Sequence, residues 1–103
     1  MIFVKVTYTV SSDFAAKNKK NVEKFVNDIR KLNNPAIRYT SYVSEDGKTF
    51  THMSAFKSEE DQQQFLSLPS FKLFQQERDA SGLESSATVE MLQVAASSYD
   101  IFD

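Results

Sequence analysis

Residues 49–74 read TFTHMSAFKSEEDQQQFLSLPSFKLF, and this stretch holds a strand, a helix start and a helix interruption in succession. Its opening segment, TFTHMSAF, is rich in the β-branched and aromatic residues that favour strands. Ser58 is a suitable N-cap, and the three acidic residues after it are favourable at the positive end of a helix dipole. Pro69 then interrupts the helix, and we expect a new turn to start at Ser70 and to continue until Gly82.

The segment upstream predicts a β-hairpin made of Ile37–Ser44 and Thr49–Phe56. Between them lies Glu45-Asp46-Gly47-Lys48, and an Asp-Gly pair is preferred in a type I′ turn, whose two central residues both have positive φ. If Asp46 and Gly47 are these central residues, Glu45 pairs with Lys48. The ladder then continues through Val43 and Phe50, Ser41 and His52, Tyr39 and Ser54, and Ile37 and Phe56. The opposite face carries Arg38, Thr40, Tyr42, Thr51, Met53 and Ala55.

The remaining elements lie on either side of this hairpin. The start, MIFVKVTYTV, alternates as a strand with Ile2, Val4, Val6, Tyr8 and Val10 on one face. A helix capped by Ser11, Ser12 or Asp13 follows, and its apolar stripe consists of Val22, Phe25, Val26, Ile29 and Leu32. Asn33-Asn34-Pro35 ends it, because Asn tolerates a left-handed exit and Pro cannot continue a helix. We expect a last strand over Ala87–Ala96 and a packed tail from Tyr99 to Asp103.

The order β-α-β-β-α-β predicts an α+β fold of the ferredoxin-like type, a four-stranded antiparallel sheet with both helices on one face. We expect residues 1–103 to form one domain, since a chain of 103 residues has room for a single core. The sheet face away from the helices should then be polar, yet Phe3, Leu92 and Val94 fall on it. A second copy of the sheet would cover this apolar face, so we expect a homodimer.

Composition excludes several classes of function. The chain has no Cys, one His and a net charge of −2, so it lacks thiolate chemistry, a metal-ligand set and the basic surface that nucleic acid requires. The glycines, Gly47 and Gly82, form no phosphate-binding loop. We predict no metal, no cofactor and no nucleic-acid partner. No apolar run approaches the roughly 20 residues of a membrane span, so we expect a cytoplasmic protein that does not bind membranes.

The whole chain resembles the antibiotic-biosynthesis monooxygenase-like group of dimeric α/β-barrel proteins. The resemblance is carried by the aromatic-rich strand, the acidic helix start and the break Leu68-Pro69-Ser70-Phe71, which is similar to an S-P-H-F motif. Members that act on quinols, polyketides or haem often have a histidine six residues before the Phe of this break, where this chain has Phe65. The histidine of the break itself is replaced by Ser70.

Family haem degraders also use a Trp and an Asn of the first strand. This chain has no Trp, and it offers Thr7 and Thr9 there, which argues against haem degradation. The resemblance therefore implies the fold, the dimeric α/β barrel and oxygenase-type chemistry, and it transfers no catalytic set.

His52 is the candidate catalytic residue, because an imidazole can hold or deprotonate a phenolic hydroxyl near neutral pH. On the expected register it shares a face with Tyr39, Ser41 and Ser54 and lies beside Phe50, which makes a candidate substrate-binding set of polar groups in an apolar surrounding. A purely structural histidine, hydrogen-bonded within the sheet or at a dimer interface, is the competing interpretation. Arg38 on the other face is a carboxylate-binding candidate, or a residue that reaches Glu90 of the last strand. Phe25, Phe65, Phe71 and Phe74 have the spacing of core residues.

Three functions fit these residues. The first is a cofactor-independent monooxygenase-like protein that acts on a small aromatic or quinol-like compound in the barrel pocket, with the compound supplying its own electrons to oxygen. The second is a non-catalytic small-molecule-binding or stress-response protein on the same barrel. The third is a protein whose two-faced sheet serves dimerisation alone.

Overall fold

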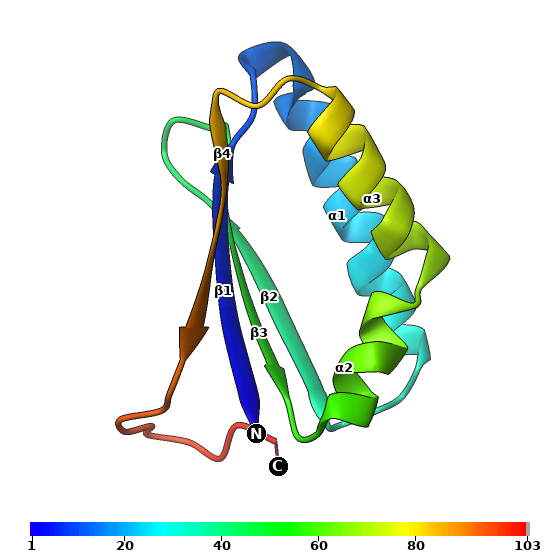
Figure 1. Ribbon diagram of the computed structural model, residues 1–103, viewed down its shortest axis with the longest axis vertical. Helices are drawn as coiled ribbons and strands as arrows, with labels where there is room; N and C mark the ends of the chain where they lie inside the picture. Colours follow the sequence, from blue (N-terminus) through cyan, green and yellow to red (C-terminus); the bar gives the residue numbers. More distant parts are fainter. Residues whose placement is uncertain (103) are drawn as a thin grey trace.

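The computed structural model describes residues 1–102 and has one four-stranded sheet covered by helices on one side (Figure 1). The sheet order is β2-β3-β1-β4, and every neighbouring pair is antiparallel. The predicted β-α-β-β-α-β arrangement is thereby confirmed. The elements are β1 (Ile2–Thr9), α1 (Ser12–Lys31), β2 (Ile37–Val43), β3 (Thr49–Phe56), α2 (Glu59–Leu66), α3 (Pro69–Ala80) and β4 (Ser85–Leu92).

The core lies between the sheet and the helices and is mostly aromatic. The predicted stripe of α1 faces inward, with Val22, Phe25 and Ile29 buried. The four phenylalanines expected in the core all belong to it, and Phe25 lies 4.9 Å from Phe74 between ring centroids. No helix among residues 1–102 is long and apolar enough to cross a membrane.

The helix boundaries follow the capping residues. Ser11 caps α1 by accepting a hydrogen bond from the Phe14 amide, and Ser58 caps α2 in the same way with the Asp61 amide. Asn33 has φ 51°, which confirms the left-handed exit from α1. Pro69 divides the second helical segment into α2 and α3, because its ring fits the first turn of a new helix and not the interior of an old one.

The predicted hairpin register is confirmed, but the predicted turn type is wrong. Val43 pairs with Phe50, Ser41 with His52, Tyr39 with Ser54, and Ile37 with Phe56. Gly47 has φ 75° whereas Asp46 keeps a negative φ, and the Gly47 amide donates to the Ser44 carbonyl over 2.9 Å. The turn is therefore centred on Glu45 and Asp46, and the expected Glu45–Lys48 pair is absent from the ladder.

The side chain of Asp46 explains this turn. Its carboxylate accepts hydrogen bonds from the amides of Lys48 and Thr49, each over 2.9 Å, and from the Thr49 hydroxyl over 2.6 Å. These donors hold the pKa of Asp46 below its usual value, with the Thr49 hydroxyl as the main cause. A carboxylate with three donors closes the loop without a positive φ at Asp46.

The last strand differs from its predicted bounds of Ala87–Ala96, because β4 runs from Ser85 to Leu92. Within residues 1–102 it pairs with β1 alone, and Leu92 is paired with Phe3 near the start of that strand. Beyond Leu92 little of β1 is left to pair with, so the ladder ends although the apolar sequence continues. Val94 consequently lies outside the strand.

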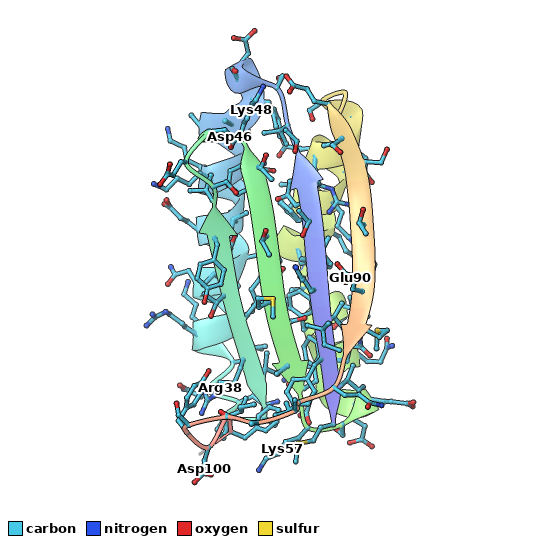
Figure 2. The ribbon with its side chains drawn as sticks, turned by 90° about the vertical axis from the view of Figure 1, so that its left-hand side faces the viewer. Arg38, Asp46, Lys48, Lys57, Glu90 and Asp100 are labelled. Carbon is cyan, nitrogen blue, oxygen red and sulfur yellow. The ribbon has the colours of Figure 1, made fainter. Side chains whose placement is uncertain are left out.

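The segment after β4 folds back across the end of the sheet that contains the N-terminus (Figures 1 and 2). Phe102 is buried and lies 6.3 Å from Phe3 between ring centroids, so the end of the tail packs as expected, whereas Tyr99 and Asp100 are exposed; Asp103 lies outside the described residues. Arg38 holds this segment, since its Nε donates to the Ile101 carbonyl and its terminal nitrogen to that of Phe102. The suggested contact between Arg38 and Glu90 is wrong, because β2 and β4 are the two outer strands (Figure 2).

Candidate functional site around His52

His52 lies in the middle of β3 and points toward the helices. Its side chain is 3% exposed, and both ring nitrogens have partners. Nε2 is 2.8 Å from the hydroxyl of Tyr8, and Nδ1 is 2.6 Å from the hydroxyl of Tyr39. The Nδ2 amide of Asn18 donates to the same Tyr8 hydroxyl over 2.9 Å. We call these four side chains, Asn18, Tyr8, His52 and Tyr39, the relay.

The sheet register explains why the relay forms. His52 is directly opposite Val6 on one side and Ser41 on the other, so Tyr8 and Tyr39 are its diagonal neighbours on the two flanking strands. Diagonal neighbours on one face of a sheet are close enough for aromatic side chains to meet. Asn18 reaches Tyr8 from α1, because it lies one turn before Val22 on the buried side of that helix.

Aromatic rings surround the relay. His52 is stacked with Phe25 at a centroid distance of 6.1 Å and lies 5.6 Å from Phe74. Tyr8 is stacked with Phe50 at 5.7 Å, and Tyr39 meets Phe25 edge-on at 5.2 Å. The relay is thus a polar chain inside an apolar core, where every unpaired polar atom would be costly.

Burial keeps every titratable member of the relay neutral near pH 7. Together with the positive charge of Arg78, which acts in the same direction and is the smaller cause, it lowers the pKa of His52 to about 4. Burial raises the pKa of Tyr8 to about 12, although its hydrogen bond from Asn18 acts in the opposite direction, and it also raises the pKa of Tyr39. The guanidinium of Arg78 lies 5.1 Å above the Tyr8 ring, an arrangement typical of a cation–π contact.

An open cavity of about 470 Å³ adjoins one end of the relay. It lies between the C-terminal part of α1 and the strand β2, and its volume is in the range of small-molecule sites. Tyr39 belongs both to this cavity wall and to the relay. The other lining residues are Val26, Ile29, Arg30, Asn33, Asn34, Pro35, Ile37 and Arg38. Apolar side chains and two arginines therefore meet at this opening.

The structure brings together some of the predicted site residues and separates others. Tyr39 contacts His52 as expected from the shared face. Ser41 is directly opposite His52 but makes no side-chain hydrogen bond within residues 1–102. Ser54 donates to the Val4 carbonyl over 3.4 Å, and Phe50 is a buried core residue stacked on Tyr8.

Two members of the relay were missed by sequence reasoning. Tyr8 was assigned to the inward face of the first strand, but nothing local shows that this strand lies beside β3. Asn18 is fully buried, and its place one turn before the apolar stripe of α1 was the available signal. A polar residue at a core position of a helix indicates a buried hydrogen-bond partner.

The two positions at which the family often has histidine lie elsewhere in this core. Phe65 is buried among Phe25, Phe56 and Phe71. Ser70 is buried too, and its hydroxyl has no hydrogen-bond partner among the described residues. Within residues 1–102 no group of three or more His, Asp or Glu side chains is placed to hold a metal ion.

Comparison with solved structures shows the same fold in oxygenases. The chain is similar to an antibiotic biosynthesis monooxygenase with a TM-score of 0.78 and 12% identity, over 93% of this chain and 100% of that one. It is similar to Rv0793 from Mycobacterium tuberculosis, with a TM-score of 0.77 and 14% identity over 95% and 98% of the two chains. A mutant form of SnoaB, a cofactor-independent oxygenase from Streptomyces nogalater, matches with a TM-score of 0.71 and 12% identity over 96% and 97%.

No protein-family model matches the sequence, and the comparison with curated proteins finds no match. The fold is nevertheless that of the antibiotic biosynthesis monooxygenase-like structures, over nearly the whole length of both chains. At such low identity the likeness describes the backbone and leaves the chemistry to the side chains around His52.

Proposed function

We propose that the protein binds a small aromatic, quinol-like compound in the cavity between α1 and β2 and oxidises it with molecular oxygen, without a cofactor. The observation that carries this proposal is the double position of Tyr39, which lines the cavity and is hydrogen-bonded to buried His52. The likeness in fold to a cofactor-independent oxygenase supports the reaction class.

The reaction needs no electrons from the protein. A quinol and O₂ give a hydroxyquinone and water: one oxygen atom enters a ring C–H bond, and the other leaves as water. The quinol loses two electrons in becoming a quinone and two more in the hydroxylation, and these four electrons reduce O₂. Protein groups then have to hold the substrate oxygen in place and exclude bulk water.

His52 acts in this proposal through Tyr39. Its pKa of about 4 makes it neutral at pH 7 and a weak base, so it is better suited to hold a hydroxyl than to deprotonate one. Both of its nitrogens are already bonded within the chain. We therefore assign the contact with the substrate oxygen to Tyr39 and the positioning of Tyr39 to His52.

The test is oxygen consumption with 1,4-dihydroxynaphthalene as the probe. We expect the purified protein to raise the rate well above autoxidation, and His52→Ala to lower the protein-dependent rate at least about tenfold, as for the loss of one positioning group. Ser41→Ala is the matched control, since Ser41 is opposite His52 without a hydrogen bond to it. Unchanged turnover in His52→Ala would refute the role of His52.

The second candidate is a non-catalytic binding or stress-response protein. It is favoured by the hydrogen bonds that occupy both nitrogens of His52, because such a histidine serves the stability of the core. Calorimetry with the same naphthalenediol under nitrogen separates the two candidates. Binding without oxygen consumption in air supports the non-catalytic protein, whereas consumption supports the oxygenase.

We further propose that two copies associate through the sheet face opposite the helices. This face carries Phe3, Tyr42, Met53, Leu92, Val94 and Tyr99 around a cavity of about 290 Å³. Tyr42 and Tyr99 are 58% and 72% exposed, and a second apolar sheet would remove them from water. A sedimentation measurement at micromolar concentration should give the mass of two chains, and a monomer would contradict the proposal.

A further inference from the structure

The hydrogen atoms of the relay can be counted. A neutral imidazole has one N–H and one acceptor nitrogen, and each tyrosine hydroxyl has one hydrogen to donate. In the first arrangement the Tyr8 hydroxyl donates to Nε2 of His52, and Nδ1–H donates to the Tyr39 oxygen. In the second arrangement Tyr39 donates to Nδ1, and Nε2–H donates to the Tyr8 oxygen. The heavy-atom distances of 2.8 and 2.6 Å are compatible with both.

Asn18 distinguishes the two arrangements. With the Asn18 amide in the orientation that the structure gives it, Nδ2 donates to the Tyr8 oxygen and Oδ1 has no partner among the described residues. In the second arrangement Tyr8 therefore accepts two hydrogen bonds, and its own hydrogen has no acceptor among the described residues. Tyr8 is 1% exposed, and water cannot supply the missing partner. A buried donor without an acceptor is strongly disfavoured.

The first arrangement leaves a hydrogen unused at the other end of the relay. Tyr8 then donates one hydrogen bond and accepts one, and both nitrogens of His52 are satisfied. The Tyr39 hydroxyl accepts from Nδ1–H and keeps its own hydrogen. Tyr39 is partly exposed as a residue, in contrast to Tyr8, and it lines the cavity between α1 and β2, so we assign this hydrogen to the cavity end of the relay.

We propose that Asn18 is a positioning residue that holds His52 in the Nδ1–H form and thereby makes Tyr39 a hydrogen-bond donor to the cavity. The ligand class follows and rests on the proposed function: the group that faces Tyr39 is an acceptor oxygen, namely a quinone carbonyl or a phenolate. A ligand that can only donate at this position is disfavoured, because the Tyr39 oxygen already accepts from His52.

The tautomer can be measured directly because the chain has a single histidine. Protein grown with ¹⁵N-labelled histidine and studied by NMR at pH 9, where the imidazole is neutral, shows two ring nitrogens. We expect the protonated-type resonance on Nδ1 and the unprotonated type on Nε2. A proton on Nε2 in the unmodified protein overturns the proposal, and this reading does not depend on any variant folding.

The variant Asn18→Asp tests the part of Asn18. The carboxylate replaces a donor with an acceptor of nearly the same size, so the Tyr8 hydroxyl should donate to it and the His52 proton should move to Nε2. Asn21→Asp is the matched control, since it adds the same charge one turn along α1 at an amide whose Nδ2 has no hydrogen-bond partner within residues 1–102. We expect the control to keep the proton on Nδ1. Retention on Nδ1 in Asn18→Asp would show that Asn18 does not select the tautomer.

The ligand class is tested with 1,4-naphthoquinone and naphthalene, which share a ring system and differ in the acceptor oxygens. We expect the unmodified protein to bind the quinone about fivefold or more tighter, the range of one hydrogen bond, and Tyr39→Phe to abolish most of this preference. The absence of cysteine removes thiol addition to the quinone as a complication. If both compounds bind equally well and the His52 proton is on Nδ1, the ligand class alone is refuted. If neither compound binds, the proposed cavity function is refuted and the tautomer assignment still holds.

Discussion

At the scale of single residues, a histidine and two tyrosines share one buried hydrogen-bonded chain at the centre of an aromatic core. The relay is stable there because nearly every donor and acceptor has a partner, and on the helix side Asn18 donates to the Tyr8 hydroxyl. The Oδ1 atom of Asn18 is an exception, since it is buried without a partner among the described residues.

The depressed pKa of His52 makes stability depend on pH in the acid range. Folded His52 protonates at about 4, whereas an unfolded histidine protonates near 6.5, so the unfolded state binds more protons between these values. The free energy of unfolding should fall as the pH drops from about 6.5 to about 4, by at most about 3 kcal/mol from this residue. Urea unfolding at pH 7 and pH 4.5 measures the loss. His52→Gln should show a smaller loss over the same interval, and an equal loss would contradict the assignment.

Removal of the Tyr8 hydroxyl tests the relay as a source of stability. Tyr8→Phe leaves Nε2 of His52 and Nδ2 of Asn18 without a partner in a buried site, and we expect a loss of about 2 kcal/mol. Tyr42→Phe, on the exposed face of the sheet, is the matched control and should change stability by less than about 0.5 kcal/mol. Circular dichroism during thermal unfolding gives the melting temperatures of the two variants. Similar melting temperatures for Tyr8→Phe and Tyr42→Phe would show that the hydroxyl of Tyr8 contributes little.

Part of this site could be predicted from the sequence. The pairing of Ser41 with His52 followed from the hairpin, and it placed Tyr39 on the face of His52. Tyr8 and Asn18 could not be placed, because their contacts depend on which strand lies beside β3 and on how α1 is rotated over the sheet. These are properties of the tertiary packing; the place of Asn18 one turn before the apolar stripe of α1 indicated a buried position and did not identify its partner.

At the scale of elements, the loop between β2 and β3 depends on one glycine. Gly47 has φ 75°, and a Cβ built there would meet nothing within 4 Å, so a side chain would be penalised by backbone strain alone. Gly47→Ala should therefore destabilise the protein by about 1 kcal/mol. Gly47→Asn should recover part of the loss, since Asn tolerates the left-handed region better than Ala. Chemical denaturation of the three proteins gives the order, and an Ala variant as stable as the parent would exclude strain at this position.

The elements themselves were largely predictable, and the two errors have a common cause. Turn type and the end of β4 are set by interactions outside the local pattern. The Asp46 side chain captures the loop amides, and β1 limits how far β4 can pair. Caps, prolines and hydrophobic periods act within a few residues, and for this reason the start of α1, the break at Pro69 and the hairpin register could be derived from the sequence.

At the scale of the whole molecule, the two faces of the sheet have separate tasks in our proposals. The helix side holds the relay, and the opposite side carries the apolar surface that we assign to a second copy. The apolar residues on both faces of the strands could be recognised in the sequence. The face that carries His52 could not be recognised in the sequence, because it depends on which side of the sheet α1 and α3 cover.

One substitution separates the two faces. Leu92→Lys places a charge on the face away from the helices and should convert the proposed dimer to a monomer, because burying an unpaired charge is strongly unfavourable. Val89→Lys is the matched control on the same strand, since Val89 points to the other face and is 63% exposed. Light scattering after gel filtration measures the mass of each variant. A Leu92→Lys variant with the same mass as the parent would refute the assignment of this face.

The tyrosines are divided between the two faces, and this has a spectroscopic consequence. The chain has four tyrosines and no tryptophan, so its ultraviolet emission comes from phenol groups alone. Tyr8 and Tyr39 are bonded to His52, whereas Tyr42 and Tyr99 are exposed on the opposite side. A chain with Tyr42→Phe and Tyr99→Phe would emit only from the relay, and one with Tyr8→Phe and Tyr39→Phe only from the open face. The molecule thus contains two intrinsic fluorophore pairs, one for ligand entry and one for association.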